Sequence, residues 1–135
     1  MDGHTPIMCA AQQGHPDIVT LLLENNADAS LPNNNGFTAL HAAAAYNQND
    51  VCLMLCAGKD VDPKDNLGAT PLFYASINGH EEVAKTLLEN KADPNAKLQE
   101  TSYSPLHVAA YYNQSEMCQL LLNNGAHIDA IDNQG

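Results

Sequence analysis

Cysteines, histidines and paired carboxylates are the residues of this 135-residue sequence that could carry out chemistry. Its four cysteines are Cys9, Cys52, Cys56 and Cys118. None of them belongs to a Cys-x-x-Cys pair, and no set of cysteines and histidines has the spacing of zinc ligands. The carboxylates of Glu81 and Glu82 fall at the start of a predicted helix, where the helix dipole and the solvent account for them. The sequence also has no glycine-rich phosphate loop and no nucleophile elbow, so we expect no enzyme, no metal site and no cofactor.

The charge of the chain restricts the partners that it can bind. There are 16 Asp and Glu residues against 5 lysines and no arginine, for a formal net charge of -11. A phosphate-binding surface needs clustered cations, so we expect no binding to nucleic acid and none to anionic membranes. No run approaches the roughly 20 apolar residues that a membrane span needs. The cysteines fit small buried residues in a reducing compartment, and we therefore expect a cytoplasmic protein. Because the chain is strongly acidic, we expect its protein partner to be neutral or basic.

A short motif recurs four times along the chain. Its copies are Thr5-Pro6-Ile7, Thr38-Ala39-Leu40, Thr70-Pro71-Leu72 and Ser104-Pro105-Leu106. The steps from Thr5 to Thr38, to Thr70 and to Ser104 are 33, 32 and 34 residues. A fixed period of this length predicts a stacked array of small units rather than one closed core.

The local chemistry predicts two short helices in each unit. Thr or Ser followed by Pro is typical of a helix N-cap and first turn, and an alanine-rich helix of about eight residues follows. These first helices should end at Gly14, Asn47, Gly79 and Asn113, because Gly and Asn best tolerate the left-handed conformation. The second, leucine-rich helices should begin near Pro16, Asn49, Glu81 and Ser115. The polar remainder of each unit predicts an extended loop with a hairpin tip.

These units resemble the ankyrin repeat family over essentially the whole chain. The segments that carry the resemblance are Gly36 to Ala44, Gly68 to Leu72, Gly79-His80 and Leu87 to Ala96. The resemblance implies an all-α solenoid of helix-turn-helix units with projecting hairpin loops, and a protein-binding module without catalysis. It gives a single domain over residues 1–135, with repeats at approximately 3–35, 36–67, 68–101 and 102–134.

The four units alternate between two patterns. The first and third carry Gly14-His15 and Gly79-His80, whereas the second and fourth have Asn-Gln there and instead carry His41 and His107 after the first motif. We infer the duplication of a two-repeat block. The resemblance implies that these four histidines are hydrogen-bonded framework groups.

Both ends keep apolar residues that a terminal repeat normally replaces with polar ones. Unit one keeps Ile18 and Leu21, and unit four keeps Met117 and Leu120. We therefore expect the chain to be a piece excised from a longer array. The alternative is that the ends associate weakly, although we otherwise expect a monomer.

The resemblance implies that partners contact the concave face, which consists of the hairpin tips and the exposed positions of the first helices. Four of the five tyrosines fall at these positions. Exposed aromatic residues are costly unless something covers them, and tyrosine is favoured at binding hot spots. The predicted contact residues are Phe37, Tyr46, Leu67, Ile77, Tyr103, Tyr111 and Tyr112, with Asn35, Asn78 and Glu100. The alternative is that the tyrosines only pack against neighbouring hairpins, and that the chain is a structural spacer within a longer solenoid.

One asparagine is a candidate site of covalent modification. Asn95, in the loop after the second helix of unit three, resembles the ankyrin asparagines that an oxygenase hydroxylates. The alternative is that Asn95 only braces its loop by bonding to backbone groups.

Overall fold

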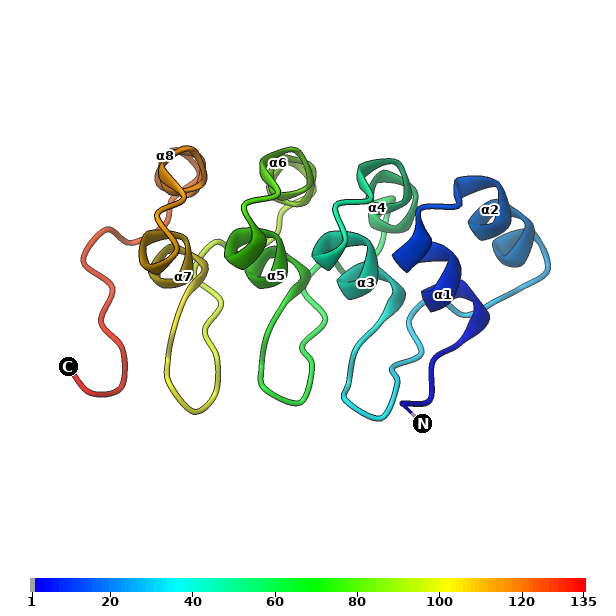
Figure 1. Cartoon of the computed structure of the whole chain (residues 1–135), viewed down its shortest axis with the longest axis horizontal. Helices are drawn as coiled ribbons and strands as arrows, with labels where there is room; N and C mark the ends of the chain where they lie inside the picture. The colour runs from blue at the N-terminus through cyan, green and yellow to red at the C-terminus, as the bar shows by residue number, and fades with distance from the viewer. Residues whose placement is uncertain (1) are drawn as a thin grey trace.

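The computed structural model describes residues 2–135, which form eight α-helices in four consecutive pairs. The helices are α1 (Pro6–Gln13), α2 (Pro16–Glu24), α3 (Ala39–Ala45), α4 (Asn49–Cys56), α5 (Pro71–Asn78), α6 (Glu81–Glu89), α7 (Pro105–Tyr111) and α8 (Ser115–Asn123). Figure 1 shows the pairs standing side by side in a row, with α2, α4, α6 and α8 in one layer and α1, α3, α5 and α7 in the other. Long loops project from the second layer, and we call each helix pair with its loop a repeat, numbered 1 to 4. The all-α solenoid with projecting loops is confirmed.

The first helix of each repeat begins at a hydroxyl residue that caps it. The side chains of Thr5, Thr38, Thr70 and Ser104 each accept a hydrogen bond from the backbone N–H three residues later. Because these N–H groups have no partner within the helix, the caps fix where each helix starts. The helices end next to residues with a left-handed backbone, as predicted: Gly14, Asn47, Gly79 and Asn113.

The core runs through the array from one repeat to the next. Small residues such as Ala11, Ala43 and Ala75 are fully buried where the first helices pack together, because alanine lets helices approach closely. Leu72 and Leu87 are also fully buried, and burial of such a side chain contributes about 1.5–3 kcal/mol to stability.

Contacts between neighbouring repeats alternate in the same way as the sequence. In repeat 2, Gln48 Nε2 donates to the carbonyl oxygen of Gln12 in repeat 1 at 3.2 Å. This glutamine fills space that a Cβ atom on Gly14 would occupy, and Gln114 of repeat 4 lies against Gly79 of repeat 3 in the same way. Between repeats 2 and 3 the contact is different, because His80 Nε2 donates to the carbonyl oxygen of Ala45 at 3.1 Å.

Two sequence-based expectations are wrong at the N-terminal end. Cys52 and Cys56 are buried as predicted, but Cys9 is exposed. The corresponding residue of repeat 3, Tyr74, packs against the preceding repeat, whereas no helix precedes α1 within residues 2–135. His15 is also exposed, and its ring has no hydrogen-bond partner within residues 2–135. It is therefore not a hydrogen-bonded framework group.

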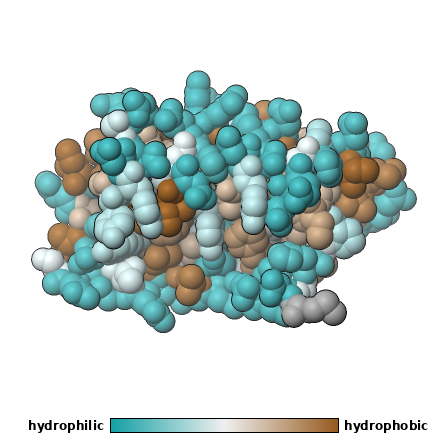
Figure 2. Space-filling model, in the orientation of Figure 1, coloured by the Kyte–Doolittle hydropathy of each residue, from teal (hydrophilic) through white to brown (hydrophobic). Residues whose placement is uncertain are grey.

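The two ends of the array expose apolar side chains that are covered in the middle. Ile18 of α2 is 46% exposed, whereas Val51, at the same position in repeat 2, is 1% exposed. At the other end, Ile128 is 73% exposed, whereas its counterpart Val61 is 5% exposed. Figure 2 shows hydrophobic patches at these two ends, over α2 and beside the C-terminal loop.

Candidate functional site

The projecting loops fold back on themselves and join tip to tip. Backbone hydrogen bonds close the three complete loops between Asn33 and Phe37, Asp65 and Ala69, and Leu98 and Tyr103, at 2.9, 3.0 and 2.9 Å. Neighbouring tips are joined by the N–H of Asn66 to the carbonyl of Asn35 and by the N–H of Gln99 to the carbonyl of Leu67, at 2.9 and 3.0 Å. The tips therefore form a continuous ledge along one side of the array.

A side chain at the base of each of the first two loops holds that loop in shape. Asn33 Oδ1 accepts the backbone N–H groups of Asn35 and Phe37 at 2.9 and 3.0 Å. Asp65 Oδ1 does the same at the next loop and accepts the N–H groups of Leu67 and Ala69, both at 2.9 Å. The two loops are thus built alike, with an amide in one and a carboxylate in the other.

An aromatic cluster lies where the loops meet the first helices of repeats 2 and 3. The Phe37 ring stacks on His41 with 5.0 Å between centroids, and it meets Tyr74 edge-on at 5.3 Å. The hydroxyl of Tyr74 donates to Asp65 Oδ2 at 2.6 Å. Burial first, and then the hydrogen bond to Asp65, raise the pKa of Tyr74 well above its usual value, so the phenol stays protonated.

His41 supports this cluster from within the core. Its Nδ1 accepts the backbone N–H of Thr38 at 3.1 Å, and its Nε2 donates to the carbonyl oxygen of Ala69 at 2.9 Å. Burial lowers the pKa of His41 below its usual value, so the ring is neutral near pH 7. His41 therefore ties repeat 2 to repeat 3 directly beneath the Phe37 ring.

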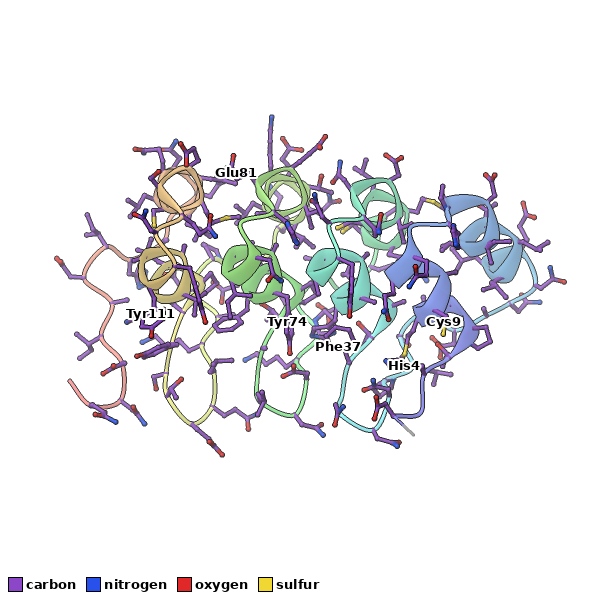
Figure 3. The ribbon with its side chains drawn as sticks, in the orientation of Figure 1. His4, Cys9, Phe37, Tyr74, Glu81 and Tyr111 are labelled. Atoms are coloured by element: carbon purple, nitrogen blue, oxygen red, sulfur yellow. The ribbon has the colours of Figure 1, made fainter. Side chains whose placement is uncertain are left out.

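A hollow of about 440 Å³ opens in front of this cluster, between the first tips. Its walls include Phe37, Leu67 and Tyr74, and its acidic groups are Asp2 and Asp65. The volume is within the range of about 300–1,000 Å³ that is usual for ligand pockets. In Figure 3, Phe37 and Tyr74 lie close together at the base of the loops.

The C-terminal half of the same side has a different character. The Tyr103 ring stacks on His107 with 5.2 Å between centroids. Tyr111 and Tyr112, at the end of α7, meet edge to face at 5.0 Å and are 76% and 51% exposed. Leu98 takes the place of Asn33 and Asp65 in the third loop, and the backbone N–H of Tyr103 instead donates to Thr101 Oγ1 at 3.3 Å.

Comparison with known proteins assigns the family. The family model described as ankyrin repeats, in three copies, matches residues 1–65 and 54–132. The chain belongs to the ankyrin repeat family. Ankyrin repeats generally act as protein–protein interaction modules, and their fold is not a catalytic one.

Three relatives match nearly the whole of this chain. Neurogenic locus notch homolog protein 1 of Danio rerio is 36% identical over 134 residues, which are 98% of this chain and 6% of the relative. The human proteins neurogenic locus notch homolog protein 1 and protein 2 are 34% and 36% identical, each over 98% of this chain and 5% of the relative. The chain thus spans about a twentieth of the length of these relatives.

The structure places the predicted contact residues of the ankyrin concave face in two groups. Seven are exposed: Asn35, Tyr46, Leu67, Asn78, Glu100, Tyr111 and Tyr112. Three are half-buried: Phe37, Ile77 and Tyr103. Asn35, Phe37 and Leu67 come together around the hollow. Tyr111 contacts Tyr112, whereas Tyr46 lines neither the hollow nor this tyrosine pair. In Figure 3, Tyr111 lies near α7, away from Phe37, and Glu81 lies on the opposite side of the array.

Asp65 and Tyr74 are not among the predicted contact residues, although both line the hollow. Tyr74 is the one tyrosine outside the predicted set; it is half-buried, and its hydroxyl reaches the carboxylate at the base of the loop. Alignment of the repeats contains a signal for Asp65, because it takes the position of Asn33.

Asn95 braces two repeats. Its Oδ1 accepts the backbone N–H of His127 at 2.9 Å, and its Nδ2 donates to the carbonyl of Gly125 at 3.0 Å. These bonds support the bracing interpretation, and hydroxylation of Asn95 stays a prediction.

Across residues 2–135, no group of three or more His, Cys, Asp or Glu side chains is placed to hold a metal ion. None of the helices in that range has the length and apolar character that crossing a bilayer requires.

Proposed function

We propose that this chain is an interaction module that binds a neutral or basic protein through its concave face. The observation that carries the proposal is the exposure of aromatic residues on that face, with Tyr111 at 76% and Tyr46 at 54%. A partner that covers these rings removes apolar area from water and can hydrogen-bond to their hydroxyl groups. The net charge of -11 supports a partner that is not acidic.

The proposal includes where and how the chain works. The family has a non-catalytic fold, so we propose that the chain acts by binding and not as an enzyme. We also propose a monomer in the cytoplasm, which is supported by the free thiols of Cys9, Cys52, Cys56 and Cys118. The absence of arginine supports the exclusion of nucleic acid as a partner.

The uncovered ends favour a second candidate function. Ile18 and Ile128 occupy positions that are covered in the central repeats, as expected for a segment that other repeats would flank. In this case the chain is a structural spacer, and its concave face has no partner.

The test compares three forms of the chain, each first checked for folding by circular dichroism. The first is the unchanged chain, and the second carries Tyr46→Ala, Tyr111→Ala and Tyr112→Ala. The third is a matched control with Leu31→Ala and Leu53→Ala, which removes side chains that are 49% exposed and lie outside the predicted contact set. Each form is immobilised, and a protein retained from a lysate is then purified and titrated calorimetrically.

The interaction proposal expects the partner to bind the unchanged chain and the control equally. Loss of one hot-spot residue costs about 2 kcal/mol, or roughly thirty-fold in affinity, so the tyrosine variant should bind far more weakly. Equal binding of one partner to all three forms would contradict the proposed face. Retention of nothing by any form would favour the spacer.

A further inference from the structure

We propose that the hollow between the first loop tips binds an arginine side chain of the protein partner. This inference rests on the proposed function, because it names the chemistry that part of the concave face recognises. The residues that carry it are Phe37, Asp65, Leu67 and Tyr74.

The first argument is the carboxylate of Asp65. This side chain is only 7% exposed, yet it lines the hollow. It accepts two backbone N–H groups on Oδ1 and the Tyr74 hydroxyl on Oδ2. A carboxylate has about four acceptor positions, so one position on Oδ2 is left for a donor from outside.

The second argument is that no side chain of residues 2–135 forms an ion pair with this carboxylate, including His4, which also lines the hollow. Within residues 2–135 the one ion pair joins Lys85 and Glu89 on α6. His41, which contacts the Tyr74 ring, is neutral because burial lowers its pKa. A buried carboxylate without an ion-pair partner, with Asp2 also at the hollow, makes this a local negative site.

The third argument is the lining of the hollow. Phe37 and Tyr74 present half-buried rings, and Leu67 is 58% exposed beside them. Guanidinium groups stack on aromatic rings and are more weakly hydrated than ammonium groups, so they lose less on entering such a site. Rings, an aliphatic wall and a carboxylate therefore complement arginine better than lysine.

The repeats themselves provide substitutions that should preserve the fold. Asp65→Asn places at the second loop the amide that Asn33 provides at the first, where its Oδ1 makes the same two backbone bonds. The matched control is Asp62→Asn. Asp62 accepts the N–H of Asp93 at 3.0 Å, and Asn95 provides the same kind of bond one repeat later. Both variants remove one negative charge from the segment between α4 and α5, but only Asp65 lines the hollow.

The experiment is a nuclear magnetic resonance titration with blocked tripeptides. The probes are acetyl-Gly-Arg-Gly-amide, its citrulline analogue, which keeps the shape and removes the charge, and its lysine analogue. We expect the arginine peptide to shift signals of Phe37, Leu67 and Tyr74 in a saturable way, and the other two peptides to bind more weakly. Asp65→Asn should weaken binding of the arginine peptide about ten-fold or more, because a charge-assisted hydrogen bond is lost. Asp62→Asn should leave binding unchanged.

Three results would overturn the inference. These are equal binding of the arginine and citrulline peptides, equal binding of the arginine and lysine peptides, and shifts centred on the acidic residues of α6 and α8. Its failure can be told apart from failure of the proposed function. A purified partner that is lost with the tyrosine variant but retained by Asp65→Asn would refute arginine recognition and leave the interaction module intact.

Discussion

His41 gives the sharpest test of how the repeats are held together, because His107 shares its cap bond and its ring stack but not its bond to the next repeat. Both rings accept the N–H of a capping residue on Nδ1, at 3.1 Å from Thr38 and from Ser104. Both also stack on an aromatic ring, at 5.0 and 5.2 Å. Only His41 donates from Nε2 to the next repeat, and within residues 2–135 no repeat follows to accept from His107.

The substitutions are therefore His41→Asn and His107→Asn. The amide oxygen of asparagine can take the place of Nδ1, so both variants keep an acceptor for the cap and both lose the ring stack. His41→Asn additionally removes one of the two hydrogen bonds that the carbonyl of Ala69 accepts, and only the bond from the N–H of Asp65 remains. A hydrogen bond contributes about 0.5–1.5 kcal/mol, and His41 also loses its contact with Tyr74, so His41→Asn should be the less stable variant by at least this amount.

Urea denaturation followed by helix circular dichroism measures this difference. With an m value of about 2 kcal/mol/M, it corresponds to a midpoint at least about 0.25–0.75 M lower for His41→Asn than for His107→Asn. Equal midpoints would refute the argument, because the bond between repeats would then contribute nothing beyond the cap and the stack.

Three further predictions follow from single residues. Gly14→Ala should lower the free energy of unfolding by about 1 kcal/mol more than Gly58→Ala. Both glycines have a left-handed backbone, but only Gly14 lies against a glutamine of the next repeat. Equal losses of stability in thermal melts would contradict this prediction. Burial holds the pKa of His41 in the folded chain below its unfolded value of 6.5, so the unfolded chain binds more protons and stability should fall as pH drops below about 6.5. Urea midpoints at pH 7.5 and 5.5 measure this fall, and His41→Asn should reduce it; an unchanged pH dependence would count against it. Asn95→Ala should cost about 1–3 kcal/mol and speed hydrogen exchange at the His127 amide, which would stay protected if the bond were unimportant.

The helices and their order could be predicted from sequence because their signals are local. Thr70-Pro71 predicts the start of α5, and Gly79 predicts its end, with no knowledge of neighbouring repeats. The exposure of Cys9 could not be obtained in this way, since it depends on what precedes α1 in space. The half-burial of Phe37 likewise depends on rings from two other positions, His41 and Tyr74.

Sequence reasoning locates candidate contact residues on the loop tips and first helices, but it does not specify the chemistry around the hollow. Exposed aromatic residues such as Tyr111 stand out from residue type and repeat position alone. The role of Asp65 needed the three-dimensional link to Tyr74, nine positions later in the chain, which no spacing rule specifies.

The alternating contacts between repeats limit how an array of this kind can change length over evolution. Loss of repeats 2 and 3 together would bring Gln114 against Gly14 and recreate a pairing that the chain already uses. Loss of repeat 2 alone would instead bring His80, which bonds to Ala45 of repeat 2 in the present chain, against that glycine. Unequal recombination is therefore expected to be tolerated in steps of two repeats, so that the inherited unit is the pair and not the single repeat.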